Sequence, residues 1–178
     1  MPRISALVLL PLLVLSCGYS TSSLLPEGVH RLAVDVFDND TFYREIEFTL
    51  TREVAAELRQ RSDVLLSRRD SADAVLTGRI LKVVRPTLVE TNRDLVSEQA
   101  VIVTAEVTLW DTKTGKARMR FTLANRAEFI VERGETLETA FDEALKDLAE
   151  DIVNALQNES FLRERGYEPG IPPPHPPR

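Results

Sequence analysis

A long β-hairpin is the strongest structural signal in this chain. Residues 101–110, VIVTAEVTLW, alternate between apolar and polar side chains, so the odd-numbered apolar residues fall on one face of a strand. The stretch DTKTGK at 111–116 supplies a turn, with Gly115 available for a positive φ angle. ARMRFTLANRAEFIV then returns with a second alternation. Two paired strands with one apolar face need other elements to cover that face.

Two amphipathic helices can provide this cover. The first is predicted from about Phe42 to Arg61, after FDNDT, in which Asp40 or Thr41 can cap it. Its apolar residues recur every four positions, at Ile46, Leu50, Val54 and Leu58. The second begins after Thr136, a suitable cap, and carries another apolar stripe, made of Leu137, Phe141, Ala144, Leu145, Leu148, Ile152 and Leu156. Each helix can bury one face against the sheet.

Further strands complete the predicted sheet. RLAVDVF at 31–37 and AVLTGRILKVVR at 74–85 are strand-like, and VLLS at 64–67 is a short strand. Pro86 ends the long strand, and residues 87–97 show no clear period and are predicted as a loop. The predicted fold is an α+β two-layer sandwich, with two helices packed on one face of a mixed sheet of four or five strands. The other face of the sheet would meet water or a partner.

The chain begins with the layout of a secretory signal peptide. Residues 1–16 carry Arg3, an apolar run shorter than a membrane span, and Ser16. VLSC, which ends at Cys17, resembles a bacterial lipobox, although Leu15 stands where a small residue is more usual. The resemblance implies that the cysteine carries acyl chains such as palmitate, and the Gly that follows it implies the outer membrane, with the domain on the periplasmic side. An ordinary signal peptide with an incidental cysteine is the alternative.

The rest of the chain divides into a tether, one domain and a tail. Residues 17–28 are small and polar and form a lipidated tether, and 29–158 form the α+β domain. Residues 159–178 are polar and then proline-rich, so they are predicted to be disordered. A length of 178 residues has room for one such domain.

Little in the chain supports catalysis, a cofactor or a metal. Histidine occurs twice, as His30 in the tether region and His175 in the tail, and neither is placed to share a packed pocket. The single cysteine would be consumed by acylation. Asp35, Asp38 and Asp40 form the one acidic cluster near a strand end, where turn and cap roles are favoured over a metal or acid/base site. A net charge of −6, with no Lys/Arg run longer than two residues, gives nucleic acid binding no support. We therefore expect a binding protein without enzyme activity.

Three arginines are candidates for ligand binding. Arg118 and Arg120 share one strand face, and Arg79 lies on the neighbouring long strand, where simple alternation puts Lys82 on the opposite face. Guanidinium groups suit phosphate and carboxylate, so these arginines could bind an anionic glycolipid. The alternative is strand-face charge that keeps the sheet soluble.

The order and spacing of four segments match a known family. They are Cys17-Gly18-Tyr19, Leu25-Pro26 leading into Arg31-Leu32-Ala33-Val34-Asp35-Val36-Phe37-Asp38-Asn39, Ala72-Asp73-Ala74-Val75-Leu76-Thr77-Gly78-Arg79-Ile80, and Trp110-Asp111-Thr112-Lys113-Thr114-Gly115. Over roughly residues 17–157 the chain resembles the LPS-assembly lipoprotein LptE and its relatives. The resemblance implies the same two-helix, four-strand fold.

The resemblance also implies partners. Members of this family plug the outer-membrane barrel LptD, help it to assemble and bind lipopolysaccharide on its way to the cell surface, without turnover. The alternatives are another periplasm-facing outer-membrane lipoprotein, such as an activator of peptidoglycan synthases, and an undetected hydrolase that uses the acidic cluster.

Overall fold

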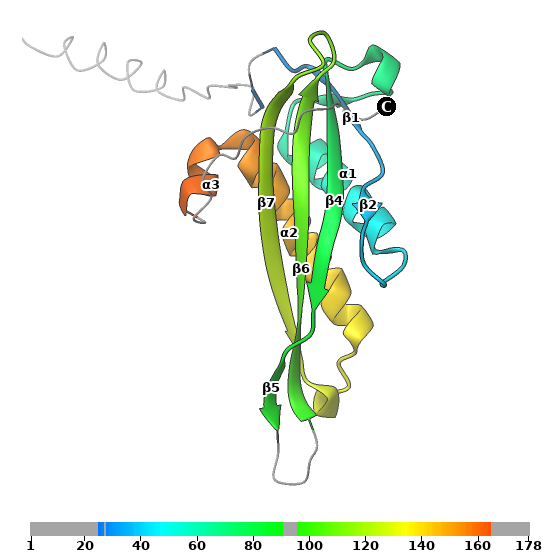
Figure 1. Ribbon diagram of the computed structural model, residues 1–178, viewed down its shortest axis with the longest axis vertical. Coiled ribbons are helices and arrows are strands. Elements are labelled where there is room, and N and C mark those ends of the chain that lie inside the picture. The colour runs from blue at the N-terminus through cyan, green and yellow to red at the C-terminus, as the bar shows by residue number, and fades with distance from the viewer. Residues whose placement is uncertain (1–24, 27, 91–95, 165–178) are drawn as a thin grey trace, which may run out of the picture.

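The computed structural model describes residues 25–26, 28–90 and 96–164, with the side chains of 87–98, 159 and 163–164 excepted (Figure 1). The strands are β1 (Arg31–Val34), β2 (Asp38–Asn39), β3 (Leu65–Leu66), β4 (Ala74–Val84), β5 (Thr87–Glu90), β6 (Val96–Asp111) and β7 (Ala117–Phe129). The helices are α1 (Ile46–Arg61), α2 (Leu137–Gln157), α3 (Glu159–Glu164) and the 3-10 turns η2 (Arg69–Ser71) and η3 (Val131–Arg133). The predicted signal peptide, Cys17 and the proline-rich segment lie outside the described residues.

The strands form one mixed sheet. The order is β3-β1-β4-β6-β5, with β7 also paired to β6 and β2 also paired to β4. The neighbours of β1 are parallel to it, whereas β6 runs antiparallel to β4, β5 and β7. The predicted hairpin is therefore β6 and β7, and the long strand β4 flanks it. The α+β prediction is confirmed.

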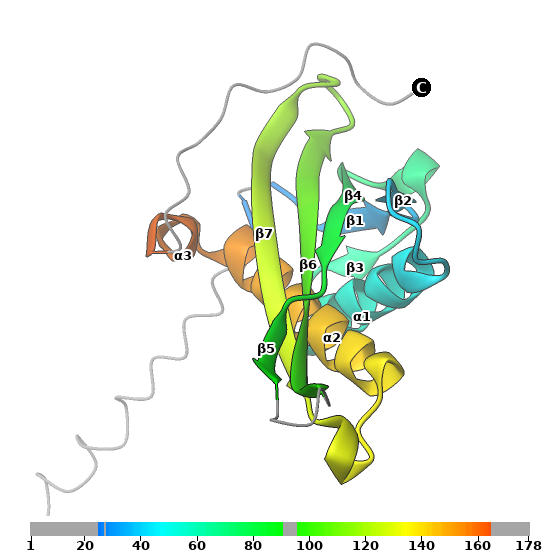
Figure 2. The same ribbon diagram turned by 60° about the horizontal axis from the view of Figure 1, so that its bottom comes forward.

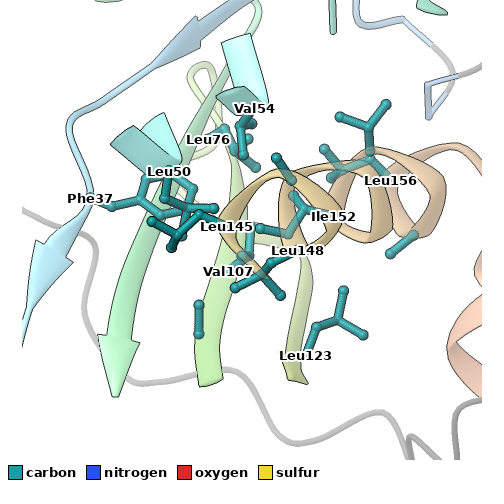
Figure 3. Packing of buried hydrophobic residues seen from close by; sticks show 14 of the residues in the cluster. Phe37, Leu50, Val54, Leu76, Val107, Leu123, Leu145, Leu148, Ile152 and Leu156 are labelled. Carbon is teal, nitrogen blue, oxygen red and sulfur yellow. The ribbon is translucent and has the colours of Figure 1, made fainter. Parts of the chain in front are cut away.

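Both long helices lie on the same face of the sheet (Figures 1 and 2). The predicted stripe of α1 is buried at Ile46, Leu50, Val54 and Leu58. On α2, Leu145, Leu148 and Ile152 are at most 1% exposed, and they face the buried odd-numbered residues of β6 (Figure 3). The apolar periods of helix and strand thus identify the faces that make the core.

The helix α2 begins as predicted, but α1 does not. Thr136 and Thr139 form a reciprocal capping box at the start of α2. The first helix was predicted from Phe42 with Asp40 or Thr41 as its cap; it begins at Ile46, after Glu45 at φ 73°, with no side-chain cap.

Tertiary hydrogen bonds explain the late start of α1. The backbone N–H of Asp40 donates to the carbonyl of Ile80 on β4, 3.0 Å away, which holds this segment against the sheet. The side chain of Asn39 accepts from the Thr41 N–H at 2.9 Å and donates to the Tyr43 carbonyl at 2.6 Å, so a local turn replaces the first helical turn.

Two further predictions of irregular structure are wrong. Residues 87–97 were predicted as a loop, but β5 pairs with the start of β6, with register shifts on either side of Val89. These shifts remove the regular alternation that would have revealed a strand. Residues 159–164 were assigned to a disordered tail, but they form α3, in which Leu162 is 5% exposed and belongs to the core. At the other end, Leu25 of the predicted tether is also buried.

Candidate functional site: the outward face and the hairpin end of the sheet

The face of β4, β6 and β7 that points away from α1 and α2 is the first candidate site. The register places Arg79 opposite Glu106, and Thr108 opposite Arg120, so these polar side chains share this outward face. No helix in the described part of the chain lies over it (Figure 1). This arrangement agrees with the prediction that helices cover only one side of the sheet.

A β-bulge corrects one predicted position. The pairing of β4 with β6 shifts between Ile80 and Lys82, because Ile80 pairs with Ala105 and Lys82 with Thr104. Leu81 is the extra residue, and beyond it the side-chain alternation of β4 is reversed. Lys82 therefore lies on the same face as Arg79, whereas simple alternation predicted opposite faces.

The arginines of the outward face are held by acidic and hydroxyl groups. Arg79 lies 3.2 Å from a carboxylate oxygen of Asp38 and 3.8 Å from one of Asp40. Arg120 donates to Thr108 Oγ1 at 3.2 Å and lies 3.6 Å from Glu106. Both arginines are consequently paired and this face is not purely cationic, although the exposed Lys82 forms no ion pair with a described residue.

The predicted acidic cluster is divided between two arginines. Asp38 and Asp40 pair with Arg79, while Asp35 pairs with Arg69 at 3.1 Å. No group of three or more His, Cys, Asp or Glu in the described residues is arranged to hold a metal ion.

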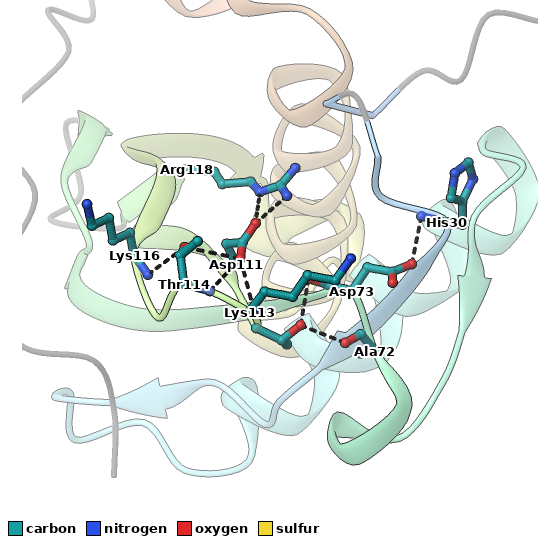
Figure 4. A network of polar contacts seen from close by, with 9 residues as sticks. His30, Ala72, Asp73, Asp111, Lys113, Thr114, Lys116 and Arg118 are labelled. Carbon is teal, nitrogen blue, oxygen red and sulfur yellow. Dashed lines mark hydrogen bonds and ion pairs between the residues drawn. The ribbon is translucent and has the colours of Figure 1, made fainter.

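Arg118 has a different role from Arg120, because Arg118 closes the β6–β7 hairpin. It falls at a register shift near the start of β7 and donates through Nε to Asp111 Oδ2 at 2.8 Å, with a second contact through Nη2. Asp111 also accepts the backbone N–H groups of Lys113 and Thr114, at 2.9 and 2.8 Å (Figure 4). The Arg118 guanidinium first, and then the Thr114 N–H, hold the pKa of Asp111 well below its usual range.

Asp73 connects the hairpin end to the start of β1. Its carboxylate accepts the backbone N–H groups of Arg31 at 2.9 Å and His30 at 3.1 Å, and these bonds lower the pKa of Asp73 (Figure 4). Thr112 donates its hydroxyl to the carbonyls of Ala72 and Asp73, both at 2.8 Å. The segments around 72–74 and 110–115, which carried the sequence resemblance, therefore meet at this end and fix its geometry.

Trp110 is enclosed on the outward face. It is 8% exposed, packs with Ala33 and Val75 and donates its indole N–H to Thr77 Oγ1 at 3.0 Å. This second, smaller apolar cluster explains why the hairpin end of the outward face is buried without a covering helix.

Two exposed aromatic residues beside α1 were not predicted from the sequence. Phe42 is fully exposed in the loop before the helix, and Phe48 on α1 is 58% exposed. A signal for Phe48 was available, because it lies two positions from both Ile46 and Leu50 and so falls off the buried stripe. Among the described helices, none is long and apolar enough to cross a membrane.

This fold is found in solved structures, among them those of two lipoproteins. Rare lipoprotein B from Shewanella oneidensis is 20% identical, with 77% of this chain and 99% of that chain covered and a TM-score of 0.51. An uncharacterized lipoprotein B from Nitrosomonas europaea is 12% identical, with 83% and 93% covered and a TM-score of 0.53. No curated protein sequence matches the chain.

The match to a family model covers most of the domain. The model is that of LptE, described as lipopolysaccharide-assembly, and it matches residues 29–156. These residues include every long strand, all of α1 and α2 up to Leu156. The chain therefore belongs to the LptE family of lipopolysaccharide-assembly proteins.

Proposed function

We propose that this protein is an outer-membrane lipoprotein, anchored through Cys17 on the periplasmic side, that plugs an LptD-type barrel and assists lipopolysaccharide assembly by binding without catalysis. The observation that carries the proposal is the family match over residues 29–156. The lipobox-like sequence around Cys17 supports the anchor, since several acyl chains on one cysteine hold a domain at a membrane.

The outward face of the sheet is suited to a barrel lumen. The interior of a large outer-membrane barrel is polar, so a plug needs a polar surface whose charges are already compensated. The pairs Arg79 with Asp38 and Arg120 with Glu106 meet this need for the two arginines, because neither charge of a pair would be left alone when water is displaced, while Lys82 would need a partner from the barrel. The exposed Phe42 and Phe48 offer apolar contacts at the side of the domain.

Arg79 is the best placed of the three arginines for contact with lipid phosphate. Its side chain is 51% exposed, whereas those of Arg118 and Arg120 are 28% and 23% exposed and are engaged with Asp111 and Glu106. Phosphate oxygens could compete with the exposed carboxylates for the Arg79 guanidinium. A role for Arg118 and Arg120 in ligand binding would require them to leave their more enclosed partners.

The partner is tested by purification from detergent-solubilised membranes with a tag after residue 178. We expect a large outer-membrane barrel to co-purify. The variant Arg120→Glu, which reverses a charge on the outward face, should weaken recovery, while Lys146→Glu on α2 serves as the matched control away from that face. Recovery of an inner-membrane peptidoglycan synthase instead would contradict the proposal.

The anchor and the biological role have separate tests. Replacing Cys17 with Ser should release the folded protein from membranes, and an unchanged membrane association without acylation would contradict the anchor. Depletion of the protein should reduce lipopolysaccharide at the cell surface. A normal surface level after depletion would contradict the assembly role even if the anchor is correct.

A further inference from the structure

The first described residues of the chain and the turn of the β6–β7 hairpin lie at the same end of the domain (Figure 1). Leu25, the first described residue, is buried in the core, and the chain then runs to His30 and Arg31 beside Asp73 (Figures 1 and 4). Cys17 precedes Leu25 by eight residues, which span at most about 28 Å when fully extended. A lipid surface that holds Cys17 is therefore within reach of this end.

This end carries exposed basic side chains that the domain neutralises only in part. Arg68, Arg69 and Arg118 pair with Asp70, Asp35 and Asp111. The remaining cations Arg31, Lys113 and Lys116 are exposed and form no ion pair with a described residue. We call these three residues the basic end. Two other carboxylates lie at this end. Asp63 is exposed and precedes Leu65, which is bonded to His30. Asp73 accepts two backbone N–H groups through Oδ2, and the charges of Arg31 and Lys113 also lower its pKa, so these two carboxylates offset only part of the positive charge of the basic end.

The opposite end of the domain is acidic. The segment from η3 into the first turns of α2 exposes five carboxylates and one arginine, namely Glu132, Glu135, Glu138, Asp142, Glu143 and Arg133. Figure 1 shows η3 and the hairpin turn at opposite ends of the long axis. The domain is therefore polarised, with surplus positive charge near the tether and surplus negative charge far from it.

We propose that, before the domain enters a barrel, the basic end docks on the anionic phospholipid headgroups of the leaflet that holds the anchor. The proposal rests on the proposed acylation of Cys17. Each Lys or Arg near an anionic membrane strengthens partitioning about fivefold, and the attraction decays within about 8 Å at physiological ionic strength. A weak attraction of this kind is sufficient, since the acyl chains hold the protein and the charges only select its orientation. The domain then stands with the hairpin turn at the lipid and η3 away from it.

Amine footprinting of the full lipidated protein tests this orientation. The four lysines of the chain are Lys82, Lys113, Lys116 and Lys146, so two report on the basic end and two serve as internal controls. The protein is reconstituted in neutral phosphatidylcholine vesicles and in vesicles containing phosphatidylglycerol. We expect Lys113 and Lys116 to react at least about threefold more slowly on the anionic vesicles, with Lys82 and Lys146 unchanged, and we expect salt at about 0.5 M to remove the difference.

Matched charge reversals complete the test. Phenylglyoxal modification of Arg31 should be slowed on anionic vesicles, and the double variant Lys113→Glu with Lys116→Glu should abolish that protection. The double variant Lys82→Glu with Lys146→Glu makes the same change in net charge and should preserve it.

The outcomes separate the anchor from the docking. If the protein does not float with neutral vesicles, the anchor is absent and the inference is overturned together with it. If the protein floats with both vesicles while Lys113 and Lys116 react at equal rates, the anchor stands and the docking is overturned. Failure to recover a barrel in the purification described above would leave both of these readouts unchanged.

Discussion

A methyl group at Gly78 should disrupt the packing between β4 and the segment that precedes α1. Gly78 points to the helical side of the sheet, where its register partner is Val107. A Cβ atom built on Gly78 would lie 2.6 Å from Cζ of Phe37 and closer still to Cε2 and Cδ2 of the same ring. Phe37 is 2% exposed, and its backbone N–H is fixed to Thr51 Oγ1 at 3.0 Å, so the ring has little freedom to move away.

The magnitude follows from this geometry. The ring would have to move by roughly 1–2 Å to restore an ordinary carbon–carbon separation of about 3.5–4.0 Å. Overpacking of a well-packed core costs about 1–3 kcal/mol, and loss of glycine entropy from the unfolded chain returns about 0.5–1 kcal/mol. Because three atoms of a fixed, buried ring are in the way, the upper part of this cost, about 2–3 kcal/mol, applies, and Gly78→Ala should lower the free energy of unfolding by about 1–2.5 kcal/mol. Urea unfolding followed by the fluorescence of Trp110, the single tryptophan, measures this change.

A compensating substitution and a second glycine test the cause. In the double variant Gly78→Ala with Phe37→Leu, the smaller side chain leaves room for the methyl group. The loss of unfolding free energy in the double variant should therefore be at least about 1 kcal/mol smaller than the sum of the losses in the two single variants. Gly115→Ala is the control: its φ of 66° imposes a backbone cost, but no atom lies within 4 Å of the new Cβ, so Phe37→Leu should bring no recovery. A loss below about 0.5 kcal/mol for Gly78→Ala, or simple additivity with Phe37→Leu, would refute the reasoning.

Four further outcomes are expected. Leu148→Ala removes a fully buried side chain of α2 and should cost about 2–5 kcal/mol in urea unfolding, the largest loss expected here. Thr136→Ala should cost about 1 kcal/mol, while Thr136→Ser keeps the cap; equal losses would contradict the capping role. Because Arg118 lowers the folded-state pKa of Asp111, this carboxylate stabilises the fold above the unfolded pKa of about 4, and the stabilisation is lost as pH falls through the folded value. Asp111→Asn should therefore have a lower free energy of unfolding than the wild type at pH 7. Urea titrations should show that this free energy falls less in the variant than in the wild type as the pH is lowered. Cys17→Ser should move the protein from the membrane to the soluble fraction with an unchanged circular dichroism spectrum.

The elements that sequence predicts well are those with a local period. The helical stripe from Ile46 to Leu58 and the alternation in β6 depend on residues a few positions apart, and the buried faces follow directly from them. The start of α1 could not be predicted in this way. The backbone bond from Asp40 to Ile80 on β4 joins residues forty positions apart, and it decides whether this segment is extended or helical.

The candidate site shows the same division between local and distant causes. A strand face was correctly predicted for Arg120, but the position of Lys82 was not, because the bulge at Leu81 depends on pairing with β6. The carboxylates that pair with the arginines could not be predicted from the sequence either. Asp38 reaches Arg79 only because β2 pairs with β4, and no spacing in the sequence announces that pairing.

The family segments make a structural contribution that bears on where function should be sought. Asp73 holds the start of β1, and Asp111 with Thr112 fixes the hairpin turn and ties it to the start of β4. These three side chains form hydrogen bonds with the backbone and with Arg118. Replacing the three residues would therefore disturb the fold before it affected any ligand. Resemblance in these segments is therefore strong support for the architecture and weak support for any binding residue. Variation that alters lipid or barrel recognition should instead fall on the accessible groups outside this network, with Arg79 first on the outward face and Lys113 and Lys116 at the basic end.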